Sequence, residues 1–291
     1  MSLTVEQIEQ FHRDGYVIAE NVLKESDLAP IITAIEELIE QRADKLYAEG
    51  KIADKHEGES YQTRYEGIYR QSKEIGVGLD IMHWRHPALF EFLKNENLLN
   101  VVESLIGGEI ACNPIQHLRA KMPYDGNQAD SFQNVPWHQD AGVTLEEADP
   151  CEIITFWLPL VDAVAETGCM EIIPGAFMMG LLPHHAAGGT TIIPEYMPNL
   201  KAKLAPCPKG GIVIMNKYTP HKGTPNVSNI VRWTLDLRYQ RTGEPTGRPF
   251  HPSFVARSRS NPGSVLTDYN AWSNQWEEAI AQSEGKKIHR V

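Results

Sequence analysis

The stretch Val231-Arg232-Trp233-Thr234-Leu235-Asp236-Leu237-Arg238-Tyr239 alternates without a break between apolar and polar residues. A period of two places the apolar side chains on one face of a β-strand and the polar ones on the other. Two interpretations fit this pattern. The polar face is either exposed to solvent in a half-buried strand, or it lines the inside of a β-structure, where its charges could meet a ligand.

Similar short apolar or alternating runs begin at about residue 110. They are separated by Pro, Gly and Asn, and no helical period lies between them: 115–122, 151–161, 169–173, 211–215 and 230–239. Strands at this density predict a sandwich or a barrel. We see no repeat or linker, so the chain is expected to form a single domain over residues 1–291, with helices packed on one face of the sheets.

The first hundred residues have a helical pattern. Thr4 and Gln7 form a capping box, and Gly15 is a suitable helix end. A second helix, capped by Ser26, carries apolar residues at the spacing of one helix face: Leu28, Ile31, Ile32, Ile35, Leu38 and Ile39. Residues 87–93 and 96–106 predict two more short helices.

Residues 51–80 are polar and lack a clear period, so they are expected to form a loop that could cover a pocket. Within them Tyr61, Tyr65 and Tyr69 recur every four residues, a spacing that fits one helix face or a lid. Near the other end of the chain, Trp272 and Trp276 share this spacing and are expected to be core residues of a C-terminal helix.

The composition indicates which kinds of partner the protein is expected to bind. The chain has 291 residues, a net charge of −11 and a pI near 5.5, which argues against binding to nucleic acid or to an anionic membrane. A small-molecule substrate is therefore expected. The four cysteines form no Cys-x-x-Cys pair, and we see neither a signal peptide nor an apolar run long enough to span a membrane. A cytoplasmic protein with free thiols is the expectation.

The motif His-x-Asp occurs twice, as His12-Arg13-Asp14 and His138-Gln139-Asp140. On a helix, residues i and i+2 point about 200° apart and cannot share a metal ion. His12 and Asp14 end the first predicted helix and are therefore expected at the surface. On a strand the same spacing places both side chains on one face. His138 and Asp140, in the strand-rich half, could hold a metal together.

A facial triad of two histidines and one carboxylate needs a further histidine. His221 is the strongest candidate because it lies between two predicted strands, 211–215 and 230–239, whereas His184 and His185 lie in a stretch rich in Pro, Gly and Ala. If the polar face of 231–239 points inward, Arg232 would point toward the metal. A guanidinium group can hold the far carboxylate of a 2-oxo-dicarboxylate through two parallel hydrogen bonds.

In order along the chain, these residues resemble the phytanoyl-CoA dioxygenase family. The likeness covers Gln10-Phe11-His12-Arg13-Asp14-Gly15-Tyr16-Val17, then Pro136-Trp137-His138-Gln139-Asp140, then Phe156-Trp157-Leu158-Pro159-Leu160, then Thr167-Gly168-Cys169-Met170-Glu171-Ile172-Ile173-Pro174-Gly175, and finally His221 and Arg232. The resemblance implies a mainly β fold with flanking helices, a double-stranded β-helix (a cupin-like jelly roll) behind an N-terminal helical layer. The corresponding parts are a helical layer at 1–108, a jelly-roll core at 109–245 and a C-terminal extension at 246–291.

The resemblance also implies Fe(II), 2-oxoglutarate as co-substrate, and O₂. Carried over by position, His138, Asp140 and His221 match the iron ligands. Arg232 matches the anchor of the distal carboxylate, and Trp157 and His117 match residues near the co-substrate. The remaining expected co-substrate contacts are Gln139, Gly223 and Thr234.

Three features depart from the family pattern. Gly223 and then Thr224 stand where a small hydroxyl residue is common two positions after the distal histidine. Ala176 and Phe177 follow Pro174-Gly175 where Ser-His is common. No clear counterpart of an upstream lysine is found, although Lys73 is nearby. Phe177 and residues 178–200 are expected to reshape the substrate side.

The expected activity is hydroxylation of an unactivated C–H bond of a small organic substrate, such as a natural product, an amino-acid-like or an acyl compound, with release of succinate and CO₂. Asp140 occupies the position that a halogenase leaves open for halide, which disfavours halogenation. Two alternatives remain: a non-catalytic jelly-roll binding protein with a vestigial metal site, and a zinc hydrolase that uses the same three ligands.

Overall fold

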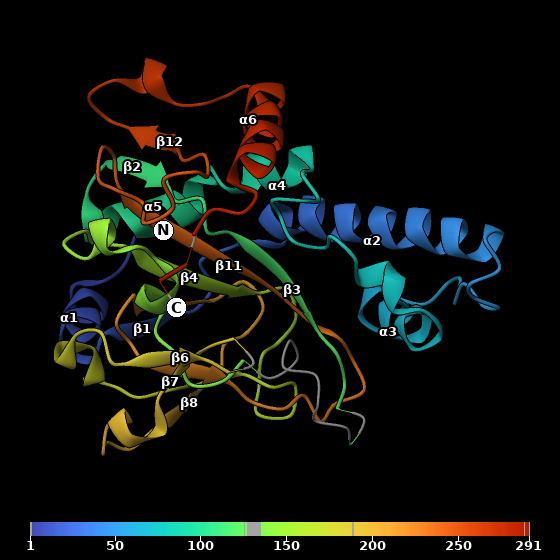
Figure 1. The fold of residues 1–291 in the computed structure, drawn as a ribbon, viewed down its shortest axis with the longest axis horizontal. Coiled ribbons are helices and arrows are strands. Elements are labelled where there is room, and N and C mark those ends of the chain that lie inside the picture. The colour runs from blue at the N-terminus through green and yellow to red at the C-terminus, as the bar shows by residue number, and fades with distance from the viewer. Residues whose placement is uncertain (1, 125, 127–134, 188, 288, 291) are drawn as a thin grey trace.

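The computed structural model describes residues 2–124, 126, 135–187, 189–287 and 289–290. Figure 1 shows the chain as strands in the middle of the molecule with helices around them. The α-helices are α1 (Val5–Asp14), α2 (Glu25–Ala48), α3 (Tyr61–Gln71), α4 (Pro87–Phe92), α5 (Glu96–Ile106) and α6 (Tyr269–Ser283). The gaps at 125, 127–134 and 188 fall inside the predicted 109–245 core, and this part of that prediction lies outside the described residues.

Among the described residues, the larger sheet has seven strands in the order β1-β9-β4-β11-β2-β12, with β3 paired to β11. Its strands are β1 (Tyr16–Ala19), β2 (Glu109–Cys112), β3 (His117–Lys121), β4 (Ile154–Pro159), β9 (Ile212–Asn216), β11 (Arg232–Arg241) and β12 (Phe254–Ser258). All their pairings are antiparallel. The long strand β11 connects this sheet, because β4 pairs along one side of it and β3 and β2 along the other.

A smaller sheet has the order β10-β5-β8, from β10 (His221–Gly223), β5 (Met170–Ile172) and β8 (Lys203–Ala205). A hairpin of β6 (His184–Ala186) and β7 (Thr190–Ile192) is separate from both sheets. Side chains of β5 and β10 line the same cavity as side chains of β4, β9 and β11. The two sheets therefore enclose an interior, as the expected jelly roll requires, and the sheet is not closed into a barrel.

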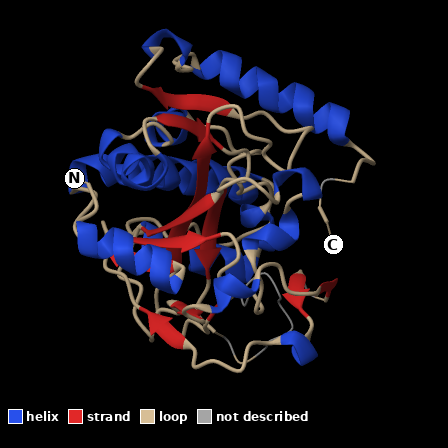
Figure 2. Ribbon diagram, turned by 90° about the vertical axis from the view of Figure 1, so that its left-hand side faces the viewer, coloured by secondary structure: helices blue, strands red, loops and turns tan. Residues whose placement is uncertain are grey.

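The helices cover the outer face of the larger sheet. The apolar residues of β11, Trp233, Leu235, Leu237 and Tyr239, are fully buried in one core with the inner face of α2 and with α3 to α6. Figure 2 shows the helices on the outside of the strands. The polar face of β11 therefore points to the interior between the sheets, because the apolar face is the one under the helices. The interior interpretation of residues 231–239 is confirmed.

The predicted capping residues are confirmed for α1 and differ for α2. Thr4 and Gln7 form the capping box of α1, and Gly15 ends it in the left-handed conformation with φ of 75°. His12 and Asp14 lie on this helix, as predicted. The second helix begins earlier than expected: Lys24, not Ser26, is its N-cap residue, and Asp27 accepts a hydrogen bond from the Lys24 backbone.

The prediction of a loop over residues 51–80 is wrong for its central part, where α3 forms. The tyrosine spacing was the better signal, since Tyr61 and Tyr65 are buried with Ile68. The Tyr65 ring packs edge-on against Trp233 with 4.9 Å between centroids. The helix is stabilised by these tertiary contacts, which a scan of local periodicity does not include.

The sequence pattern also missed β2 and β12, which pair with each other. Through β2, the segment after residue 246 joins the larger sheet, while α6 buries Trp272 and Trp276 as expected. Residues 178–200 contain the β6–β7 hairpin, which lies near the bottom of Figure 1. Of the described helices, none is long and apolar enough to cross a membrane.

Candidate metal centre

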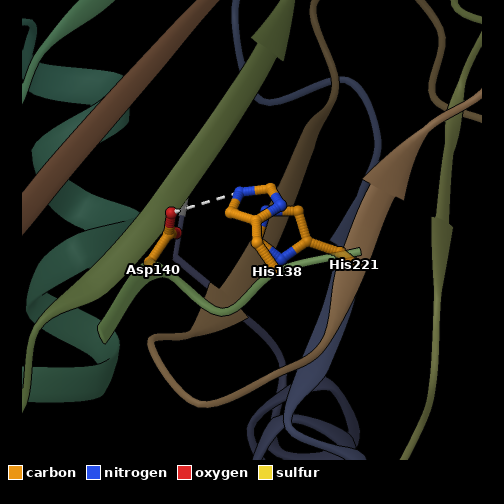
Figure 3. A group of neighbouring side chains, drawn as sticks. All are labelled: His138, Asp140 and His221. Atoms are coloured by element: carbon orange, nitrogen blue, oxygen red, sulfur yellow. Dashed lines mark ion pairs between the residues drawn. The ribbon is translucent and has the colours of Figure 1, made fainter. Parts of the chain in front are cut away.

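The neighbouring residues His138 and Asp140 meet His221, which is distant from them in the sequence, between the two sheets. One ligand atom from each of His138, Asp140 and His221 lies within 4.8 Å of the others. Figure 3 shows the three side chains beside one another. The His138 and His221 residues pair through two backbone hydrogen bonds of 3.0 Å, so the main chain sets the distance between their rings. The expected strand at 138–140 is only partly found: His138 forms an isolated bridge, whereas Asp140 begins a short 3-10 helix, η2 (Asp140–Val143).

Both imidazole rings present the same nitrogen to the centre. The Nδ1 of His138 lies 2.9 Å from the carbonyl oxygen of Pro136, and the Nδ1 of His221 lies 2.9 Å from that of Thr219. A carbonyl oxygen only accepts, so each Nδ1 must carry the proton and donate. Each Nε2 then holds a free lone pair. A second partner that orients the ring and fixes its tautomer is typical of metal-binding histidines.

The electrostatic environment keeps His138 and Asp140 in their ligating forms. Burial, together with the charge of His221, lowers the pKa of His138 to about 3, so the ring is neutral near pH 7. Burial acts to raise the pKa of Asp140, but the charges of Arg238, His221 and His138 overcome it and hold that pKa well below its ordinary value. A neutral imidazole and an ionised carboxylate are the forms that bind a metal ion.

Asp140 is oriented by two buried side chains. Arg238, on β11, donates from Nη2 to its Oδ1 at 2.5 Å. Thr155, opposite Arg238 on β4, donates its hydroxyl hydrogen to Oδ2. Both oxygens are therefore held, and each keeps a lone pair for a further contact. The carboxylate is positioned before any metal binds.

We expect Arg238→Met to weaken Fe(II) binding roughly 10- to 100-fold, the usual cost of removing a group that orients a metal ligand. Titration of the metal-free protein with Fe(II) under nitrogen measures this. The matched control is Arg241→Met on the same strand, where Arg241 pairs with Glu152 at 2.8 Å and is about half exposed. Tighter binding in the Arg238 variant would show that its positive charge repels the metal more than it orients the ligand.

The triad opens into a cavity that encloses about 740 Å³, including the part of its mouth that is open to solvent. The cavity follows the inner face of β11, where Arg232, Thr234, Asp236 and Arg238 all line it. Arg232 lies six residues before Arg238 on this face, so the two guanidinium groups line different parts of the cavity. Arg238 contacts Asp140 of the triad, and Arg232 lies at the part of the cavity away from this contact.

Arg232 has the features of an anion-binding group. Its guanidinium lies over the Trp157 ring, 4.9 Å from the centroid, and its Nη1 donates to Thr234 at 3.4 Å. Among the described residues its buried Nε has no hydrogen-bond partner. Burial lowers the pKa of Arg232 to about 10, so it remains charged near pH 7. A buried charge with an unmade hydrogen bond is costly unless a ligand completes it.

The structure brings together most of the predicted co-substrate residues but not all of them. Trp157, Gly223, Thr234 and Arg232 line the cavity with the triad. His117 is outside this lining; its Nδ1 lies 2.7 Å from a carboxylate oxygen of Asp80, before α4.

Gln139 also lies outside the cavity lining and points into the protein. Its side chain donates to the carbonyls of Gly180 and Tyr218 and accepts from the backbone N–H of Leu182. These bonds connect the loop at 180–182 to the segment that contains His138 and Asp140. The His184 ring also accepts a hydrogen bond of 3.2 Å from the backbone N–H of Gln139. The geometry supports a bracing role for Gln139, and residues 178–200 pack against the segment that carries two ligands.

Thr155, Arg238 and Lys121 are functional candidates that the sequence did not single out. Arg238 belongs to the same inward face as Arg232, so the alternation of 231–239 contained a signal for it. Thr155 and Lys121 gave no comparable signal, because their importance depends on which residues of β11 they face.

A model of the family described as phytanoyl-CoA dioxygenase (PhyH) matches residues 11–234. The chain belongs to the phytanoyl-CoA dioxygenase family. The match spans the three ligands and Arg232 and ends at Thr234. The resemblance expected from the motifs is confirmed.

The following similar proteins are all distant in sequence. A phytanoyl-CoA dioxygenase domain-containing protein 1 homolog from Caenorhabditis elegans is 22% identical over 77% of this chain and 86% of its own length. The solved non-haem monooxygenase ThoJ, in its apo form, has a TM-score of 0.65, 18% identity and 97% coverage of both chains. The epimerase SnoN, solved with Fe³⁺, α-ketoglutarate and nogalamycin RO, has a TM-score of 0.54 and 18% identity, over 84% of this chain and 87% of its own. These structures agree with a jelly-roll fold.

Proposed function

We propose that this protein is a non-haem Fe(II)- and 2-oxoglutarate-dependent oxygenase that hydroxylates a C–H bond of a small organic molecule. The observation that carries the proposal is one cavity lined both by a two-histidine, one-carboxylate centre and by a buried arginine with an unused donor. A dicarboxylate that chelates a metal through its 2-oxo acid end and extends a second carboxylate fits these two groups.

The donor set favours iron. Two imidazoles and one carboxylate would hold a metal ion and leave its other coordination positions open, an arrangement typical of Fe(II) oxygenases. Zinc could bind the same ligands, but zinc hydrolysis would leave the buried Arg232 without a role. The SnoN complex holds Fe³⁺ and α-ketoglutarate in the same kind of fold, which supports this pair of ligands here.

In this proposal the ligands are His138, Asp140 and His221, and the co-substrate contacts are Arg232, Trp157 and Thr234. Bound Fe(II) supplies the site where O₂ is activated as 2-oxoglutarate is converted to succinate and CO₂. Arg232 holds the distal carboxylate and thereby sets the orientation of the keto acid. Trp157 packs on the guanidinium and limits its rotation.

Other lining residues give the cavity an apolar surface. Met170 and Met215 contribute apolar surface to it and help to exclude water from the reacting end. With a metal bound, Asp140 would occupy the coordination position that halide would need, so hydroxylation is favoured over halogenation. We further propose a cytoplasmic location, which suits four free and buried cysteines, and a single domain over residues 1–291.

The test is succinate release from 2-oxoglutarate by the purified protein across a panel of small natural products, amino acids and acyl compounds. We expect release that requires added Fe(II), stops when a chelator removes the metal, and returns with Fe(II) but not with Zn²⁺. Under nitrogen, Fe(II) and 2-oxoglutarate together should give a weak metal-to-ligand charge-transfer absorption band. A protein that binds Fe(II) and 2-oxoglutarate but forms no succinate with any substrate would support the non-catalytic alternative instead.

A further inference from the structure

Asp236 lines the cavity from the inner face of β11. The strand register places it opposite Trp157 of β4 and His117 of β3. Its Oδ1 is buried and has no hydrogen-bond partner among the described residues. Its Oδ2 lies 3.6 Å from the Nε of Arg119, which is too far for a hydrogen bond, so these two side chains form only an ion pair. The carboxylate therefore keeps an unused acceptor beside the cavity.

The other carboxylate of the cavity is fully engaged. Among the described residues that line the cavity, the acidic ones are Asp140 and Asp236. Both oxygens of Asp140 accept hydrogen bonds, one from Arg238 and one from Thr155. A buried acceptor without a donor, as in Asp236, destabilises the protein on its own. A ligand that brings a donor removes this cost, and the torsion that turns a carboxylate is broad enough for either oxygen to meet it.

Neither the proposed metal ion nor 2-oxoglutarate supplies the donor. The described residues that could hold the metal are His138, Asp140 and His221, and Asp236 is not one of them. The oxygens of an ionised 2-oxo acid only accept hydrogen bonds, and Asp236 repels a further anion. The remaining occupant of the cavity is the molecule that is oxidised. That molecule must therefore carry an N–H or O–H group.

The charges around Asp236 favour a neutral donor. Arg119 already balances its charge, and Arg232 and Arg238 line the same face of β11. An ammonium group on the substrate would be repelled by these guanidinium groups. An alcohol carries no charge, and a single hydroxyl group can donate to Asp236 while it accepts from Arg119.

We propose that Asp236 selects the substrate by accepting a hydrogen bond from a neutral hydroxyl group, which the substrate carries away from the carbon that is oxidised. This inference rests on the proposed function and deepens it by naming the substrate class. Asp236 lies two residues before Arg238, or about 7 Å along the strand, and Arg238 holds Asp140 of the metal centre. The hydroxyl group and the oxidised carbon therefore fit within one small molecule.

The first measurement compares matched compounds. The protein is loaded with Fe(II) and 2-oxoglutarate under nitrogen, and binding is followed through the change in its charge-transfer band. The probes are sugars and cyclic alcohols, each tested beside its methyl ether and beside the amine that replaces the hydroxyl group. The alcohol should bind roughly 10- to 100-fold more tightly than the ether, the range expected for a hydrogen bond to a charged group. It should also bind more tightly than the protonated amine.

Substitutions at Asp236 test whether this residue causes the preference. Asp236→Leu should bring the Kd of the alcohol close to that of its ether, and it should not weaken 2-oxoglutarate binding. Asp236→Asn keeps an acceptor oxygen without the charge and should retain part of the preference. The matched control is Glu171→Gln, because Glu171 pairs with Lys222 of the cavity lining at 2.9 Å but is not among the described residues that line the cavity. It should retain the full preference.

The melting temperature separates recognition from a structural role. Asp236→Leu removes a carboxylate with a buried, unpaired oxygen, so the Tm of the metal-free protein should stay the same or rise. If Asp236 serves to hold Arg119 and the strand pair in place, the same change should lower the Tm.

The inference is overturned if the alcohols of the panel do not bind, or bind no better than their ethers or amines. It is also overturned if Asp236→Leu keeps the preference or lowers the Tm. These outcomes leave the proposed function intact as long as the natural protein binds Fe(II) and 2-oxoglutarate. A natural protein that binds Fe(II) but shows no charge-transfer band with 2-oxoglutarate contradicts the proposed function itself, which is a distinct result.

Discussion

His138→Ala is expected to reduce Fe(II)- and 2-oxoglutarate-dependent succinate release by more than about 100-fold, because the loss of a direct ligand should exceed the 10- to 100-fold cost of losing a group that only orients one. The variant should fold, since the two 3.0 Å bonds between residues 138 and 221 are made by the backbone. Succinate release and Fe(II) affinity, measured side by side, check the expectation.

The chain contains its own control for this substitution. His12 belongs to the other His-x-Asp motif, at an exposed position on α1, so His12→Ala should leave both measurements close to those of the natural protein. Turnover that survives the change at His138 would remove this residue from the metal centre and with it the proposed triad.

Arg232→Met is expected to raise the Kd of 2-oxoglutarate strongly while Fe(II) binding persists. Loss of one partner of a buried, hydrogen-bonded charge pair costs about 2–5 kcal/mol, which is roughly a 30-fold loss of affinity or more. Titration of the Fe(II)-loaded variant under nitrogen measures the effect. The two affinities should separate because Arg232 lines the cavity but is not one of the three residues that could hold the metal ion.

Arg232→Lys tests whether shape matters in addition to charge. Lysine keeps the charge but lacks the planar fork and the stacking on Trp157, so it should recover only part of the affinity. If methionine at this position leaves the Kd unchanged, Arg232 is not the carboxylate anchor. The buried Nε without a partner among the described residues would then need another ligand.

The sequence predicted the parts of this site that depend on local periodicity. The alternation of 231–239 predicted that Arg232 lies on the polar face of its strand. Helix geometry excluded His12 as a metal ligand and left His138 as the candidate. The motif order along the chain was enough to name the family. The 51–80 prediction failed where local pattern was weak, because α3 forms by packing Tyr65 against Trp233, which is 168 positions away in the sequence.

By itself, the sequence determined which side chains share a face of each strand and which residue types are available to bind a metal and a carboxylate. Only the tertiary structure decided which faces meet. The pairing of His138 with His221, of Thr155 with Arg238, and of Lys121 with Arg232 is set by hydrogen-bond register between strands that are distant along the chain. Register is a cooperative property of the whole sheet, whereas periodicity belongs to one strand at a time.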